Sequence, residues 1–234
     1  MKIIKLTKKS IKNNYNKWRY ASVQKIFCVG KNKTGTTSLS IAFKQLGYKV
    51  APQQPAESLI FDWSKNNRKP LVDFVKNSGQ VFQDVPFSLD KTYQWMDLAF
   101  PNSKFILTIR DDAEQWYNSL VSFHSKLWAN GNVPTKQDLQ NASYRYKGYA
   151  WEAFRLINKT PENDLYKKEV LIKGYEAYNK QVMDYFKDSS NRLLVINLKD
   201  SDATQKFSEF LELETPIDSF PWENKTSDIK TPKP

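Results

Sequence analysis

Residues 26–38 read IFCVGKNKTGTTS, and this stretch decides the fold. The run Ile26–Val29 is rich in β-branched and aromatic side chains and ends at Gly30, which is typical of a short strand. After the loop, apolar residues recur at helical spacing up to Gly47, where the pattern stops. The stretch therefore predicts a strand, a loop and a helix in that order.

The loop Gly30–Ser38 has the features of an anion-binding site. Where a strand feeds a helix, backbone N–H groups and the positive end of the helix dipole converge on one point. Gly35 lets the backbone approach a ligand closely, and three hydroxyl donors follow it, Thr36, Thr37 and Ser38. The glycine spacing matches a Walker A loop, but Thr36 stands where that motif has its lysine, so Lys33 must supply the charge. The alternative is an ordinary turn whose hydroxyls only cap the helix.

The rest of the chain alternates between expected strands and helices. Further strands are expected at residues 48–51, 80–83, 104–109 and 193–198. Helices are expected at residues 8–20, 70–78, 89–100, 113–127, 135–157, 162–187 and 202–211. This alternation predicts a three-layer α/β fold like that of P-loop NTPases, with about four to five parallel strands flanked by helices.

Length and composition indicate one globular domain over residues 1–234. Hydrophobic residues make up 40% of the sequence, and there are only 7 glycines, so a disordered or low-complexity chain is excluded. We expect residues 1–24 to form a basic N-terminal extension and residues 215–234 a proline-containing C-terminal tail. No apolar run approaches the roughly 18 residues of a transmembrane helix, and we expect a cytoplasmic protein.

The positive charge is concentrated at the N-terminus. Residues 1–56 hold twelve Lys and Arg and no Asp or Glu, although the whole chain has a net charge of only +11. Such a patch is typical of proteins that bind nucleic acid or anionic lipid. A polyanionic small molecule on the Gly30–Ser38 loop explains part of the same charge, so we expect no nucleic-acid partner.

The loop also resembles a known family. The residues KTGTT at 33–37 are similar to the Lys-(Ser/Thr)-Gly-Thr-Thr motif of sulfotransferases, which holds the 5′-phosphosulfate of 3′-phosphoadenosine 5′-phosphosulfate (PAPS). By this resemblance, Lys33 contacts the bridging oxygen and stabilises charge on the leaving 5′-phosphate. The resemblance implies that the donor is bound by the loop residues Lys33, Thr34, Gly35, Thr36, Thr37 and Ser38. It also implies PAP (3′-phosphoadenosine 5′-phosphate) as product, and no metal.

Two further segments resemble the family. Arg110 follows the expected strand 104–109, and Ser119 lies on the next helix, where sulfotransferases bind the 3′-phosphate. The usual interval is eight residues, whereas here it is nine, with Asn118 at the shorter spacing. Without the resemblance, Arg110 would simply pair with Asp111 or Asp112. Near the C-terminus, FPWENKT at 220–226 is similar to a segment that returns to the nucleotide, which makes Lys225 a further cofactor-binding candidate.

Two residues are candidates for the general base that activates the acceptor. Asp84 lies two residues before Pro86, where cytosolic sulfotransferases have their catalytic histidine, but an aspartate there needs burial to raise its pKa. Otherwise it caps the next helix or pairs with Lys33. His124 is the only histidine and follows Ser119 by about one turn, although a lone histidine on an aromatic helix is more often structural.

The sequence thus predicts a sulfotransferase that moves a sulfuryl group to a hydroxyl or amine of a small-molecule or glycan acceptor. A P-loop kinase or nucleotide hydrolase is the second hypothesis, although it lacks the lysine after Gly35. The third is a basic module that binds nucleic acid or lipid, whose affinity would fall steeply with salt. The acceptor and the oligomeric state are left open.

Overall fold

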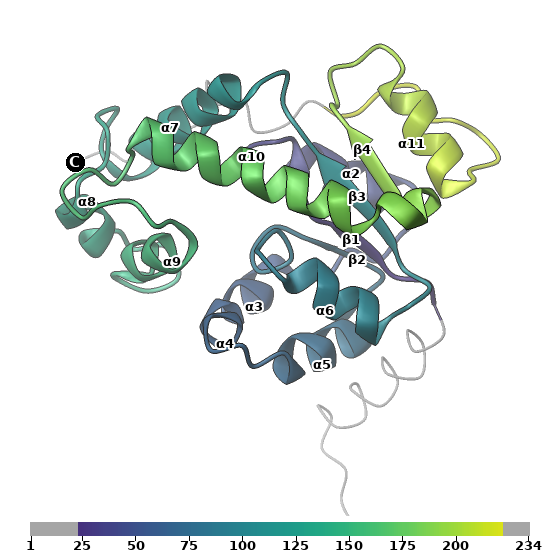
Figure 1. Ribbon diagram of the computed structural model, residues 1–234, viewed down its shortest axis with the longest axis horizontal. Coiled ribbons are helices and arrows are strands. Elements are labelled where there is room, and N and C mark those ends of the chain that lie inside the picture. The colour runs from purple at the N-terminus through teal and green to yellow at the C-terminus, as the bar shows by residue number, and fades with distance from the viewer. Residues whose placement is uncertain (1–22, 222–234) are drawn as a thin grey trace, which may run out of the picture.

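The computed structural model describes residues 23–221, which form an α/β fold around a parallel sheet (Figure 1). The sheet has four strands in the order β2-β1-β3-β4. Their bounds are Ile26–Cys28 for β1, Val81–Gln83 for β2, Lys104–Thr108 for β3 and Leu193–Ile196 for β4. Every pairing is parallel, and Phe27 at the centre lies opposite Phe82 on one side and Phe105 on the other. The expected fold class is confirmed.

Helices connect the strands and cover both faces of the sheet (Figure 1). The first six are α2 (Thr36–Gln45), α3 (Gln53–Glu57), α4 (Ile60–Ser64), α5 (Lys69–Ser78), α6 (Thr92–Ala99) and α7 (Ala113–Trp128). They are followed by α8 (Lys136–Asn141), α9 (Tyr149–Ile157), α10 (Lys168–Tyr185), the 3₁₀-helix η1 (Lys187–Arg192) and α11 (Ala203–Leu211). None of the helices between residues 23 and 221 combines the length and apolar character that a membrane span needs.

The side chains of β1 and the residue after it point alternately to the two faces of the sheet, where they contribute to two separate hydrophobic cores. Phe27 and Val29 point to one face, where they share a core with residues of α3, α5, α6 and α10. Ile26 and Cys28 point to the other face and pack with residues of α2 and α11. All four residues are at most 2% exposed, so the strand is buried on both sides, as in other three-layer α/β folds.

A third cluster lies beside the sheet and joins α7, α8, α9 and α10. At its centre the rings of Trp116 and Tyr175 stack, with centroids 4.4 Å apart and planes 10° apart. The Trp116 indole nitrogen donates to the carbonyl of Asn32 at 3.0 Å. The helices beyond the sheet therefore also support the loop that follows β1.

Several sequence expectations are wrong in detail. The expected strand at residues 48–51 is only an isolated parallel bridge between Val50 and Val81. The expected helix 135–157 is interrupted between α8 and α9, because Gly148 adopts a left-handed φ of 93° and the chain turns there. The expected helix 162–187 begins only at Lys168, after turns at Pro161 and Asp164. The expected helix 8–20 lies outside the described residues.

Candidate active site

The expected site residues follow the carboxyl ends of the strands. The loop Val29–Gly35 follows β1, Asp84 follows β2, and Arg110 comes two residues after β3. Between β1 and β3 the strand order changes direction, since β2 lies on one side of this pair and β4 on the other. Ligands of open parallel sheets bind in the crevice at such a switch point.

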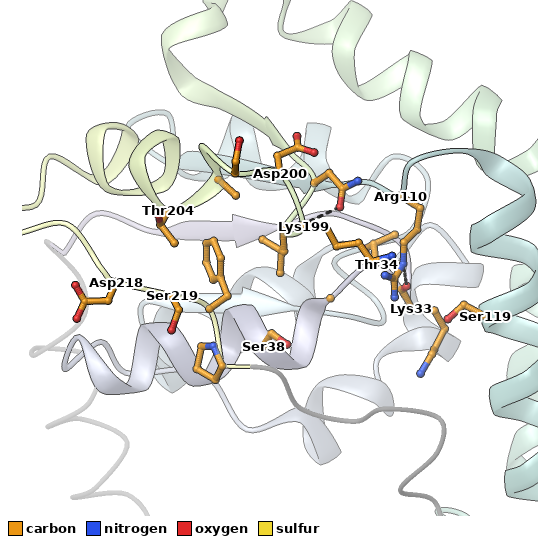
Figure 2. Close-up of a pocket in the computed structure, with 17 residues that line it drawn as sticks. Lys33, Thr34, Ser38, Arg110, Ser119, Lys199, Asp200, Thr204, Asp218 and Ser219 are labelled. Atoms are coloured by element: carbon orange, nitrogen blue, oxygen red, sulfur yellow. Dashed lines mark hydrogen bonds between the residues drawn. The ribbon is translucent and has the colours of Figure 1, made fainter.

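A pocket of about 400 Å³ opens at this edge of the sheet (Figure 2). Six expected site residues line it, from the loop after β1, the start of α2, the segment after β3 and α7: Lys33, Thr34, Gly35, Ser38, Arg110 and Ser119. Its other wall is formed by residues 197–201, 203–204 and 218–221. In Figure 2, Lys33, Arg110 and Ser119 gather at one end, and Asp218 and Ser219 lie at the other. The volume is within the range of small-molecule sites.

The loop after β1 is held in an unusual backbone conformation. Lys33 has a φ of 73° and Gly35 a φ of 101°, so the chain passes twice through the left-handed region. A Cβ on Gly35 would lie 2.7 Å from Cδ1 of Leu198, and one on Gly30 would lie 2.0 Å from Oγ1 of Thr108. Both glycines are therefore required where the loop touches β3 and the segment after β4.

The hydroxyl side chains of residues 34–38 have two roles: some hold the loop in place, and others lie on the pocket wall. Thr34 donates to the carbonyl of Lys31 at 2.6 Å and shares a hydrogen bond with the Thr108 hydroxyl at 2.6 Å, so its side chain braces the loop. Thr36 is 5% exposed, and its hydroxyl is hydrogen-bonded to Asp84. Ser38, in the first turn of α2, is on the pocket wall.

Lys33 lies where the pocket and α7 meet. Its ammonium nitrogen is 3.7 Å from the centroid of the Phe123 ring, a cation–π contact that holds the side chain at α7. Burial lowers the pKa of Lys33 to about 8, helped by the nearby charge of Arg110 and opposed by Asp84. The ammonium form still predominates at pH 7, and its charge is poorly hydrated, which strengthens its effect on a bound anion.

Arg110 is tied to the same loop. Its Nε donates to the carbonyl of Lys33 at 2.6 Å, and its backbone N–H donates to the Tyr175 hydroxyl at 3.1 Å. The two acidic residues that follow Arg110 have other partners. Asp112 caps α7 by accepting a hydrogen bond from the backbone N–H of Gln115, and the carboxylate of Asp111 is 3.8 Å from the Lys199 ammonium. Arg110 therefore stands on the pocket wall with its guanidinium facing the loop.

Ser119 lies on the pocket wall despite the unusual nine-residue interval, whereas Asn118 is exposed. Ser119 is in the second turn of α7, which begins at Ala113 after the cap by Asp112. Ser119 and Arg110 thus line one pocket even though the motif spacing differs.

Asp84 lies beside the loop rather than on the described pocket wall. Its φ is 54°, and its buried Oδ1 has no hydrogen-bond partner among the described residues. Desolvation, with a smaller contribution from the like charge of Glu57, raises the pKa of Asp84 to about 6, against the lowering effects of Thr36 and Lys33. A carboxylate with this pKa is a stronger base than an ordinary aspartate and is still ionised at pH 7.

His124 lies among aromatic rings on α7. Its Nδ1 is 2.9 Å from the Tyr166 hydroxyl, and its ring lies 4.4 Å from that of Trp128. Burial, followed by the charge of Lys33, lowers the pKa of His124 to about 3. The imidazole is therefore neutral at physiological pH and a much weaker base than free histidine.

A variant can test which role His124 has. Replacing His124 by glutamine retains a hydrogen-bonding group beside Tyr166 but removes the titrating ring. For the sulfuryl transfer expected from the sequence, we expect the rate to fall by less than about threefold, because a group with so low a pKa contributes little general-base catalysis. Steady-state rates and thermal unfolding of wild type and variant measure the effect. A loss of about 100-fold or more with normal stability would instead make His124 the proton acceptor.

Most of the second wall of the pocket is not indicated by any motif in the sequence. Residues 197–204 follow β4, and the side chain of Asn197 is hydrogen-bonded to Asp111 next to Arg110. The rule that ligands bind at the carboxyl ends of parallel strands was the signal that could have found this segment. Phe220, which packs on Phe207 of α11 at 5.2 Å between ring centroids, brings residues 218–221 to the same wall. Lys225 lies outside the described residues.

The comparison with known proteins gives the family of the chain. The family model described as a sulfotransferase domain matches residues 25–229, which include every strand and the whole pocket wall. A search among curated proteins found no significant match. Because the family model covers most of the 234 residues, the chain belongs to the sulfotransferase domain family.

Proposed function

We propose that this protein transfers a sulfuryl group from PAPS to a hydroxyl or amine of a small-molecule or glycan acceptor. One observation carries the proposal: a single pocket joins the glycine-containing loop after β1 to Arg110 and Ser119. These two sets of phosphate-binding residue types come from segments about 80 residues apart in the sequence. A nucleotide with phosphate groups at both the 5′ and the 3′ position matches such a pocket.

The residues fit the two ends of this donor. Gly35 and Ser38 at the start of α2, together with Lys33, suit the 5′-phosphosulfate, because a helix N-terminus and an ammonium group both favour anions. Arg110 and Ser119 suit the 3′-phosphate, since the planar guanidinium binds phosphate oxygens in pairs. The proposed binding set also includes Thr34, Thr36, Thr37 and Lys225. When bound, the donor supplies the sulfuryl group and a phosphate leaving group.

In this proposal Lys33 and Asp84 perform the chemistry. The Lys33 ammonium stabilises the negative charge that develops on the leaving oxygen, which is the main requirement of a loose transition state. Asp84 accepts the proton of the acceptor, since its pKa of about 6 suits a general base near neutral pH. Between the two candidates, the low pKa of His124 favours Asp84. We further propose that the reaction requires no metal and takes place in the cytoplasm.

Calorimetric titration with PAP, ADP and ATP tests the proposed donor. We expect PAP to bind at least about tenfold more tightly than ADP, because ADP lacks the 3′-phosphate that Arg110 would bind. Salt is kept constant, since all three ligands are anions. Equal affinity for PAP and ADP, or magnesium-dependent ATP turnover, would instead support a P-loop kinase or hydrolase. Tight binding of nucleic acid or anionic vesicles, without any nucleotide preference, would support a basic binding module.

A further inference from the structure

Glu57, the last residue of α3, is a buried carboxylate that connects three segments of the chain. Its Oε2 accepts from Nε of Arg145 at 2.5 Å, and its Oε1 accepts from the Tyr144 hydroxyl at 3.2 Å. Its carbonyl accepts from the hydroxyl of Tyr149 at 3.1 Å. The residue is 8% exposed. These three hydrogen bonds hold it to both the loop 142–148 and α9.

The same carboxylate is linked to the backbone beside Asp84. Nε2 of Gln53 donates to Oε1 of Glu57 at 3.3 Å and to the carbonyl of Val85 at 3.1 Å. Val85 also shares an apolar cluster with Tyr149, so the segment after β2 and α9 pack together. Glu57 is therefore held in a fixed position relative to the residue that follows Asp84.

Several groups from different elements act on Asp84 or respond to its charge. They are Lys33 of the loop after β1, Thr36 of α2, Glu57 of α3, Cys28 of β1 and Tyr144 of the loop 142–148. Among the described residues, the charged groups that act on Asp84 are a cation, Lys33, and an anion, Glu57. Lys33 favours the ionised form of Asp84, and Glu57 favours its protonated form.

We propose that Glu57 is a positioning residue of the active site, which fixes the segment after β2 and holds a negative charge beside Asp84 while Asp84 takes the acceptor proton. This inference rests on the proposed function for the reaction, but the effect of Glu57 on Asp84 does not need it. Lys33 is required for the leaving group, and by itself it would make Asp84 a weaker base. Glu57 offsets this effect without contacting the reacting atoms.

The pH dependence of kcat/KM tests the inference. In wild type we expect an acid limb near the Asp84 pKa of about 6, because the base must be ionised to accept a proton. Glu57→Gln keeps the size of the side chain and an oxygen for Arg145 but removes the charge. The acid limb is then expected to move to lower pH by about half a unit or more, and the plateau rate to fall about threefold, because Asp84 becomes a weaker base.

Three further variants separate charge from structure. Glu57→Asp retains the charge and is expected to keep most of the wild-type profile. Arg145→Gln removes the cation paired with Glu57. The negative charge of Glu57 then acts on Asp84 without a neutralising partner, so the acid limb is expected to move to higher pH. Glu152→Gln is the matched control, because this exposed carboxylate accepts from Tyr146 at the same loop but does not act on Asp84. Its profile is expected to coincide with that of wild type.

A second measurement works without any reaction. The carboxyl ¹³C shift of Asp84, followed through a pH titration of the free protein, reports its protonation directly. A lower Asp84 midpoint in Glu57→Gln and a higher one in Arg145→Gln support the inference. Unchanged midpoints, or shifts of the same sign in both variants, overturn it. If wild type transfers no sulfuryl group, the proposed function fails, and this titration still decides the role of Glu57. If Glu57→Gln does not fold, Arg145→Gln decides alone.

Discussion

Replacing Lys33 by alanine is expected to lower kcat by about 100- to 1,000-fold, because a preorganised cation at the leaving group is among the largest single contributions to such catalysis. The ammonium group lies at the pocket and is partly desolvated, so its charge is little screened by water. Binding of PAPS in the absence of acceptor is expected to weaken far less than kcat falls, since the bridging oxygen of the intact donor does not yet carry the charge that it gains during transfer. Steady-state rates with PAPS, and calorimetry with PAPS in the absence of acceptor, measure the two effects.

Lys44→Ala is the matched control for this variant. Lys44 is an exposed lysine in the last turn of α2, so its loss changes the net charge equally without altering the pocket. Alanine at position 33 keeps a Cβ at the residue with a φ of 73°, which leaves the backbone strain of the loop unchanged. A decrease of less than tenfold in kcat for Lys33→Ala would contradict the assignment of Lys33 to the leaving group.

Replacing Arg110 by alanine is expected to remove the preference for PAP over ADP. Charge-assisted hydrogen bonds to a phosphate contribute about 3 kcal/mol, so the affinity for PAP is expected to fall about 100-fold. ADP, which has no 3′-phosphate, is expected to lose much less affinity. Titration of both ligands against wild type and variant gives the change in discrimination.

A weaker affinity for PAP in the Arg110 variant has a second possible cause in the structure, and the same titration distinguishes the two. Arg110 also donates from Nε to the Lys33 carbonyl, so its loss loosens the loop after β1. That effect weakens both nucleotides alike, whereas loss of a 3′-phosphate contact weakens PAP selectively. Arg110→Lys retains a positive charge but not the planar fork, and it is expected to keep an intermediate preference. Equal losses for PAP and ADP in the alanine variant would refute the 3′-phosphate assignment.

The best predicted parts of the molecule are those that short patterns specify. The strand Ile26–Cys28 and the helix from Thr36 were expected from one stretch of 13 residues, because a buried strand, a glycine loop and an amphipathic helix each have a local signature. The strand after Gly79 and the strand before Arg110 were found for the same reason. The strand expected at residues 48–51 does not form. Val50 makes a single bridge at the edge of the sheet, and a single bridge is not a strand.

The wall formed by residues 197–201, 203–204 and 218–221 shows where local patterns are insufficient. These segments carry no glycine motif and no basic cluster that marks a ligand site. They reach the pocket because β4 pairs with β3 and α11 packs on the face of the sheet that α2 also covers. Such contacts join residues far apart in the chain, and no periodicity within a short window contains them.

The sequence by itself determined the strand–loop–helix unit, the parallel sheet and the residue types on one wall of the pocket, because backbone propensity and side-chain spacing act over a few residues. Only the tertiary structure decided how the titrating groups behave. The pKa values of Asp84 and His124 move in opposite directions because burial favours the neutral form of each, a carboxylic acid in one case and an imidazole in the other. Burial depends on packing across the whole chain, and so it does not follow from the order of the residues alone.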